Sequence, residues 1–218
     1  MSVKCPGDLN ADNKVTIDEI LASVNSALNG CLPISPRFVD NNNGTISDTK
    51  TGLVWEKKSN DGSIHDKDNR YTWSQQDSEQ WGYWDGTVFT EFLATLNREA
   101  FAGHSDWDLP SLEQLQTLLD RDSAFPAMDQ HAFNPSTCTE GCNVTSCSCT
   151  AESLAPPDSF YWSLSGLTTD MWDAWVVDFT EGTVRYEYKA SGGYARAVRG
   201  GFYVSPSTVP TSDRAPVR

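Results

Sequence analysis

The chain has 218 residues and a formal net charge of −14. Its length allows one large domain, or one domain with a small appendage. The acidic charge argues against binding to duplex nucleic acid, anionic membranes or sulfated polysaccharides, because each of these partners is itself negatively charged. No apolar run approaches the roughly 20 residues that cross a bilayer, so membrane insertion is not expected.

The first predicted element is a calcium loop, DLNADNKVTIDE, at residues 8–19. Oxygen-bearing side chains recur at alternate positions and an acid closes the loop, which is the spacing of an EF-hand. Asn13 stands where glycine is usual, and asparagine tolerates the positive φ needed there. The expected Ca²⁺ ligands are Asp8, Asn10, Asp12, Lys14, Thr16 and Glu19, and Lys14 would bind through its carbonyl oxygen.

A helix follows the loop, since apolar residues repeat at helical spacing from Ile17 to Leu28. Thr16 and Glu19 also form the pattern of a capping box, which explains these two residues without an ion but leaves the preceding acids unexplained. Calcium is therefore favoured. The stretch resembles a single dockerin repeat, with Cys5 and Cys31 flanking it as a predicted disulfide. We expect this module to span residues 1–32 and a Pro-containing linker to span 33–36.

The other four cysteines are close together in the sequence, at Cys138, Cys142, Cys147 and Cys149. An even number of cysteines in a loop-rich chain indicates disulfides and an oxidising compartment. Cys147 and Cys149 are too close in sequence to join each other easily, so each is expected to pair with one of the other two, in either order. A zinc site is the less favoured alternative.

Beyond the linker, strands are followed by helices and then by strands again. Residues 37–58 indicate a hairpin that turns at Asn43-Gly44, and residues 59–86 indicate a long loop held by Trp73, Trp81 and Trp84. Two amphipathic helices are expected near 87–101 and 111–119, the second capped by Ser111. The last predicted hairpin turns at Glu181-Gly182, and residues 204–218 form a Pro- and Ser-rich tail. The absence of βαβ alternation predicts an α+β fold with antiparallel strands and two helices.

Five stretches in order, FVDNNNGTISDTKTGLVW, DWDLPSLEQLQTLLD, FYWSLS, AWVVDFTEG and YARAVRGG, resemble the Lcl C-terminal domain family over residues 37–203. The resemblance implies an exported, C-type-lectin-like domain used for display or adhesion at the cell surface. Some members of this family are also diversified in their C-terminal segment by retroelements. The first residues, MSVKCPGD, contain no hydrophobic signal segment, so an exported protein would be represented here by its mature form.

The loop after Ser165 and the last hairpin are the expected ligand-binding surface. In that hairpin Val184, Tyr186 and Tyr188 are predicted to face inward, which would leave the intervening charged residues exposed. The expected contacts to a protein or carbohydrate ligand are Trp172, Asp173, Arg185, Glu187 and Lys189.

No catalytic motif is recognised, and adjacent His104, Ser105 and Asp106 are interpreted as a loop rather than a triad. A polysaccharide-active enzyme and a self-assembling surface or fibre subunit, which would form homo-oligomers, are the alternatives to a binding protein.

Overall fold

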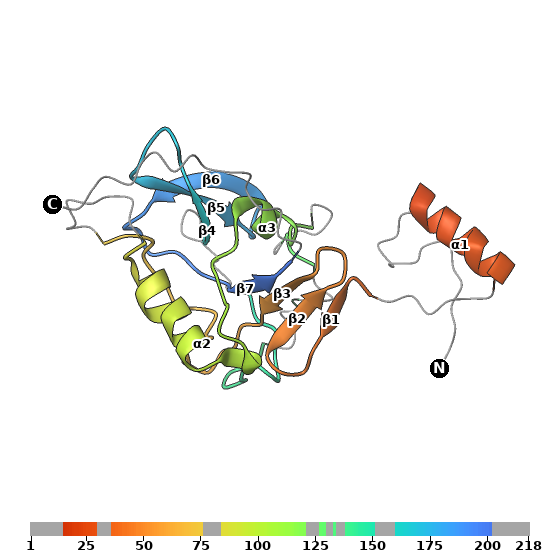
Figure 1. Cartoon of the computed structure of the whole chain (residues 1–218), viewed down its shortest axis with the longest axis horizontal. Helices are drawn as coiled ribbons and strands as arrows, with labels where there is room; N and C mark the ends of the chain where they lie inside the picture. The colour runs from red at the N-terminus through yellow and green to blue at the C-terminus, as the bar shows by residue number, and fades with distance from the viewer. Residues whose placement is uncertain are drawn as a thin grey trace. The chain divides into compact units, whose positions relative to one another are not determined.

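A computed structural model describes residues 15–29, 36–75, 84–120, 127–129, 133, 138–150 and 160–201 (Figure 1). The chain divides into two compact units, Met1–Arg37 and Phe38–Arg218. Within the described ranges, no helix has the length and apolar character needed to cross a membrane.

The first unit contains helix α1, Ile17–Asn29. The predicted capping box is present, because the Thr16 amide donates to Glu19 Oε2 at 2.8 Å and the Glu19 amide donates to Thr16 Oγ1 at 3.3 Å. The apolar side chains of this helix are largely exposed: Ile17 76 %, Ile20 49 %, Leu21 61 % and Val24 51 %.

The second unit contains two antiparallel sheets, which confirms the α+β class. The four-stranded sheet has the order β1-β2-β3-β7, with strands Phe38–Asp40, Thr45–Asp48, Leu53–Glu56 and Val198–Gly200. The three-stranded sheet has the order β4-β5-β6, with strands Phe160–Gly166, Asp173–Asp178 and Thr183–Tyr188. Both predicted hairpins are confirmed, and Gly44 and Gly182 adopt the positive φ that their turns require.

Short helices connect the sheets. They are a π-helical turn at Val88–Leu93, α2 at Ala94–Arg98, a 3₁₀ turn at Phe101–Gly103 and α3 at Leu112–Gln116. The predicted capping box of α3 is confirmed, with Ser111 and Gln114 bonding reciprocally. In the loop before the π-helical turn, Trp73 is buried as expected, whereas Trp84 is 64 % exposed and contacts the domain by stacking on the Phe89 ring. Trp81 lies outside the described residues.

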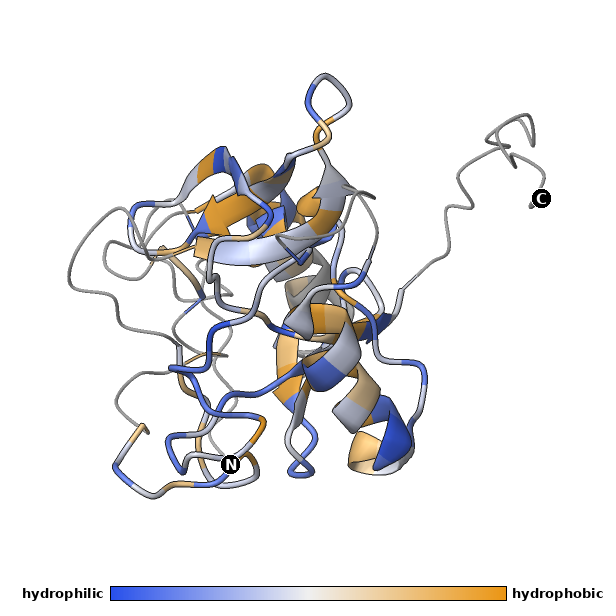
Figure 2. Cartoon of the chain, turned by 90° about the vertical axis from the view of Figure 1, so that its left-hand side faces the viewer, coloured by the Kyte–Doolittle hydropathy of each residue, from blue (hydrophilic) through white to orange (hydrophobic). Residues whose placement is uncertain are grey.

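The three-stranded sheet is buried on both faces over much of its area. Tyr161 and Val177 belong to one apolar cluster, while their neighbours Trp162 and Val176 belong to another. Because successive strand residues point to opposite faces, the sheet separates the two clusters. Its strands are accordingly rich in hydrophobic residues (Figure 2).

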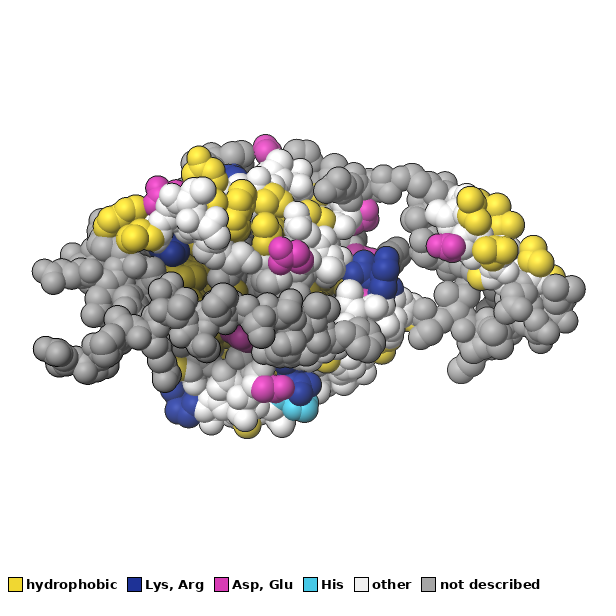
Figure 3. Space-filling model, turned by 45° about the horizontal axis from the view of Figure 1, so that its top comes forward, with side chains coloured by type: hydrophobic (Ala, Val, Ile, Leu, Met, Phe, Trp, Pro, Cys, Tyr) yellow, Lys and Arg dark blue, Asp and Glu magenta, His cyan; other side chains and the backbone are white. Residues whose placement is uncertain are grey.

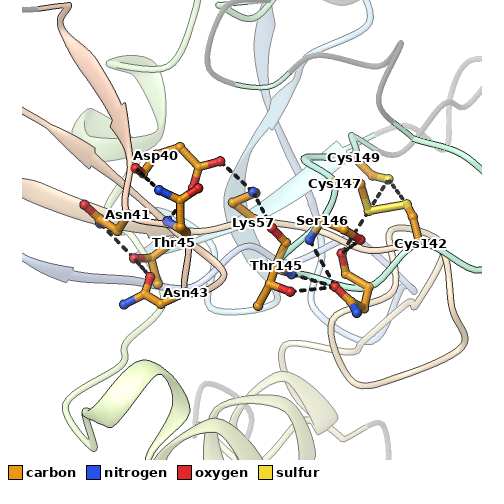
Figure 4. Close-up of polar contacts among 12 residues, drawn as sticks. Asp40, Asn41, Asn43, Thr45, Lys57, Cys142, Thr145, Ser146, Cys147 and Cys149 are labelled. Atoms are coloured by element: carbon orange, nitrogen blue, oxygen red, sulfur yellow. Dashed lines mark hydrogen bonds and ion pairs between the residues drawn. A yellow bond between two sulfur atoms is a disulfide. The ribbon is translucent and has the colours of Figure 1, made fainter.

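The four clustered cysteines form two disulfides, Cys138–Cys149 and Cys142–Cys147. This confirms that Cys147 and Cys149 each pair with an earlier cysteine and settles their order. Lys57 connects the disulfide loop to the first hairpin, since its Nζ donates to Asp40 Oδ2 at 2.8 Å and to the Thr145 carbonyl at 3.4 Å (Figure 4).

Candidate functional site

The β5–β6 hairpin changes character along its length. The register places Val177 opposite Val184 and Trp175 opposite Tyr186, and residues opposite each other in an antiparallel pair share a face. The valine end of this face packs on the core. Toward the other end the face opens to solvent, where Tyr186 is 55 % exposed and its ring meets that of Trp175 edge-on, with centroids 6.1 Å apart.

The expected orientation of β6 is therefore wrong for its two tyrosines. Tyr186 and Tyr188 face outward, while Lys189 is only 4 % exposed and Arg185 and Glu187 are partly buried.

The reason for this orientation is the charged face of the strand. Arg185 Nη1 donates to the carboxylate of Asp178 at 3.1 Å, and the Asp178 side chain is 1 % exposed. The Arg185 guanidinium also lies over the Phe160 ring, and its Nε donates to Glu187 Oε1 at 2.9 Å. A buried carboxylate needs a partner, so Asp178 favours the face of β6 that brings Arg185 to it.

Lys189 holds the loop that contains Met171 and Trp172. Its amide donates to the Trp172 carbonyl at 2.8 Å, and its Nζ donates to the Met171 carbonyl at 2.7 Å and lies over the Trp73 ring. Burial lowers the pKa of the Lys189 ammonium, while Asp173 and Asp170 act in the opposite direction. Lys189 thus holds the loop through two consecutive carbonyls.

The loop and the hairpin carry four exposed or half-buried aromatic side chains, Trp172, Trp175, Tyr186 and Tyr188, which we name the aromatic face. Trp175, Tyr186 and Tyr188 share one face of the hairpin, and Trp172 lies in the loop that precedes β5. Trp172 is 38 % and Tyr188 36 % exposed, and Met171 at its margin is 59 % exposed. Hydrophobic side chains gather on the upper part of the second unit in Figure 3.

Two carboxylates stand at the margin of the aromatic face. Asp170 Oδ1 accepts the Trp172 amide at 2.9 Å, which closes the turn. Partial burial and the neighbouring Asp170 raise the pKa of Asp173. The arrangement can stack on apolar or planar groups and accept hydrogen bonds at one margin.

A second group of charged residues was not expected from the sequence. Glu56, at the end of β3, is fully buried; its carboxylate accepts hydrogen bonds from Lys58 Nζ at 3.0 Å, His65 Nδ1 at 2.7 Å and the Ala197 amide at 3.0 Å. Arg196, also fully buried, donates to the carbonyls of Glu56 and Cys149. We name Glu56, Lys58, His65 and Arg196 the Glu56 cluster.

Burial shifts the pKa values of Lys58 and Glu56, and charged neighbours oppose it at both residues. It lowers the pKa of Lys58 to about 8, against the opposing effect of Glu56. Burial would raise the pKa of Glu56, but Lys58 and His65 together with the Ala197 amide outweigh it and leave that pKa lowered. The only sequence signal was the run EKK directly after an apolar strand, which by itself is typical of a solvated strand end. The contacts tie β3 to the disulfide loop and to the segment before β7.

Of the expected calcium ligands, Thr16 and Glu19 are described, and they bond to each other in the capping box. Asp8, Asn10, Asp12 and Lys14 lie outside the described residues, as do Cys5 and Cys31. In the described ranges, the group of side chains close enough to share a metal ion is Cys138, Cys142 and Cys149, whose sulfurs are engaged in the disulfides.

The segment His104-Ser105-Asp106 forms no triad, because Asp106 accepts two hydrogen bonds from the Arg199 guanidinium, at 2.7 and 3.1 Å.

Comparison with protein families finds one whose model, described as the Lcl C-terminal domain, matches residues 44–199. No curated protein and no solved structure matches the chain.

Proposed function

Because this chain belongs to the Lcl C-terminal domain family, we propose that it is an exported ligand-binding protein that acts in display or adhesion at the cell surface. In this proposal the second unit is a C-type-lectin-like domain, and its ligand is a protein or carbohydrate outside the cell. The two disulfides support an oxidising compartment. The protein has a binding role and no catalytic one.

The aromatic face carries the proposal. Tryptophan and tyrosine are the residues that most often dominate binding energy, because they contribute large rigid surfaces with a polar atom at one end. Here Trp172 and Tyr186 are exposed rather than buried in the core, although each lies beside a well-packed sheet. Lys189 fixes the loop of Trp172, so the face is preorganised and little ordering entropy is lost on binding.

The proposal assigns different roles to the five predicted contacts. Trp172 and Asp173 remain direct contacts, with Tyr186 and Tyr188 added to them. Lys189 acts as the support of the loop. Arg185 and Glu187, on the opposite face of β6, lie outside the ligand contact.

The test is binding to a panel of glycans and extracellular proteins by wild type and Trp172→Ala. We expect loss of at least tenfold in affinity for every ligand found, with a nearly unchanged melting temperature, because truncating an anchor residue removes about 2 kcal/mol or more of binding energy. Trp84→Ala is the matched control, since Trp84 is exposed but lies outside the aromatic face. Equal binding by all three proteins would refute the assignment of the site.

We further propose that the first unit binds Ca²⁺ through Asp8, Asn10, Asp12, Lys14, Thr16 and Glu19. Glu19→Gln separates this from simple capping, because glutamine also serves in a capping box but is a poor substitute for a bidentate carboxylate ligand. Titration calorimetry should show Ca²⁺ binding by wild type and markedly weaker binding by Glu19→Gln. Absence of binding by wild type at millimolar Ca²⁺ would refute the proposal.

A further inference from the structure

Strand β6 lies at the outer edge of the three-stranded sheet. The backbone amide of Lys189 donates to the Trp172 carbonyl, and these two residues continue the β5–β6 register. Hydrogen-bonded and non-hydrogen-bonded pairs alternate along an antiparallel ladder. The backbone N–H and C=O groups of Val184, Tyr186 and Tyr188 therefore point away from β5, toward the edge.

This edge offers unused backbone groups. Across the described ranges, no hydrogen bond reaches the outward N–H or C=O of Val184 or Tyr186. Natural sheets protect their edges with prolines, lysines, bulges or inward-pointing charges. The β6 sequence TVRYEY contains neither proline nor lysine, its register with β5 runs without a shift, and its two charged side chains, Arg185 and Glu187, already pair with each other. An edge of this kind favours the addition of another strand.

We propose that the added strand is β6 of a second copy of this chain, running antiparallel, with Tyr186 opposite the partner's Tyr186 on a two-fold axis. The two three-stranded sheets then form one continuous sheet across the dimer. Tyr186 exchanges both backbone hydrogen bonds with the partner's Tyr186, which gives two new hydrogen bonds on the axis. Val184 stands opposite the partner's Tyr188, whose carbonyl already accepts the Ser191 amide of its own chain.

Charge selects this register. With Tyr186 on the axis, Arg185 stands opposite the partner's Glu187, and the symmetry repeats this pair. Sliding the strands by two residues in one direction would oppose Arg185 to the partner's Arg185, and in the other direction Glu187 to the partner's Glu187. Like charges directly opposite each other are destabilising. Slides by one residue would bring inward-pointing backbone groups to the edge.

The charged side chains are able to reach across. Arg185 and Glu187 retain 28 % and 27 % side-chain exposure and already contact each other within the strand. They would meet the partner's pair at non-hydrogen-bonded positions, where Cα atoms are closest. On the other face of the sheet, Tyr186 beside the partner's Tyr186 joins the two aromatic faces.

The dimer does not depend on the proposed ligand, but it would present two copies of Trp172 from one sheet. An interface of strand edges is small, so we expect a dissociation constant on the order of 10 µM.

Sedimentation velocity of the full chain over a range of about 1 to 200 µM tests the proposal. Wild type should shift from monomer to dimer. Tyr186→Pro should remain monomeric with an unchanged far-ultraviolet circular dichroism spectrum, because it removes an outward N–H that β5 does not use, and proline is tolerated there. Tyr186→Thr is the matched control: it keeps the N–H and should still dimerise, more weakly.

A wild type that stays monomeric throughout the range would overturn the proposal. So would a Tyr186→Pro variant with the mass of wild type, which would place the contact elsewhere, for instance on the exposed apolar side of α1.

Cross-linking tests the register. Opposite residues of a hydrogen-bonded pair have Cα atoms about 5.5 Å apart, within reach of a disulfide. Tyr186→Cys should therefore form a covalent dimer under mild oxidation with oxidised glutathione, with each new thiol giving up one proton and one electron. Thr183→Cys, three positions from the axis, should not. The reverse result would overturn the register.

Discussion

The Glu56 cluster and the aromatic face depart from the usual distribution of residues in opposite directions. In the first, charged side chains are enclosed, and each Glu56 oxygen is matched by a donor. In the second, aromatic side chains are exposed on top of a tightly packed sheet. Buried charges with partners hold segments together, whereas exposed aromatics on a rigid support leave binding surface unused. This contrast is the reason we propose the hairpin, and not the Glu56 cluster, as the binding surface.

The largest loss of stability is expected from a substitution in the Glu56 cluster. Glu56→Gln leaves buried Lys58 without its counter-charge, and breaking one partner of a buried pair costs about 3–5 kcal/mol of unfolding free energy. Urea unfolding measures this loss. Glu99→Gln, on an exposed pair with Arg98, is the control and should change stability by less than about 0.5 kcal/mol. Equal effects would show that the cluster is not structural.

We also expect the stabilising contribution of Glu56 to depend on pH. The folded pKa of Glu56 is lowered, so its stabilising contribution is present above its ordinary pKa of 4.5 and is lost as the pH falls through the lower folded value. The stability difference between wild type and Glu56→Gln should therefore shrink as unfolding is measured from pH 7 to below about 4. A difference that stays constant over this range would argue against an ionised Glu56.

A smaller effect is expected at the support of the aromatic face. Lys189→Met keeps the aliphatic stem but removes the charged donor of the partly buried hydrogen bond to the Met171 carbonyl, which costs about 1–3 kcal/mol. Hydrogen exchange at residues 167–172 should accelerate, and ligand affinity should fall with it. Lys50→Met, at an exposed position, is the control. Slower or unchanged exchange would show that Lys189 does not hold the loop.

The smallest effect is expected on the aromatic face itself. Tyr186→Thr removes an exposed ring that packs on Trp175 at one edge, so monomer stability should fall by less than about 1 kcal/mol in thermal unfolding at low concentration. A loss of several kcal/mol would show that Tyr186 belongs to the core, and the contrast with the Glu56 cluster would then not hold.

Local features could be predicted from the sequence because their causes are local. The capping boxes at Thr16 and Ser111 need residues three positions apart, and the turns at Gly44 and Gly182 need one permissive residue. The spacing of Cys147 and Cys149 limited their partners before the structure fixed them.

The tertiary structure alone decided which side of β6 faces inward. Alternation along a strand defines two faces, but not which of them meets the core. Both faces of β6 are covered in part: Val184 packs on the core, Tyr186 on the same face is left exposed, and Arg185 on the other face reaches the buried carboxylate of Asp178. The Glu56 cluster could not be predicted for the same reason: it joins Glu56 to Arg196, 140 positions away, and no local pattern records such a contact.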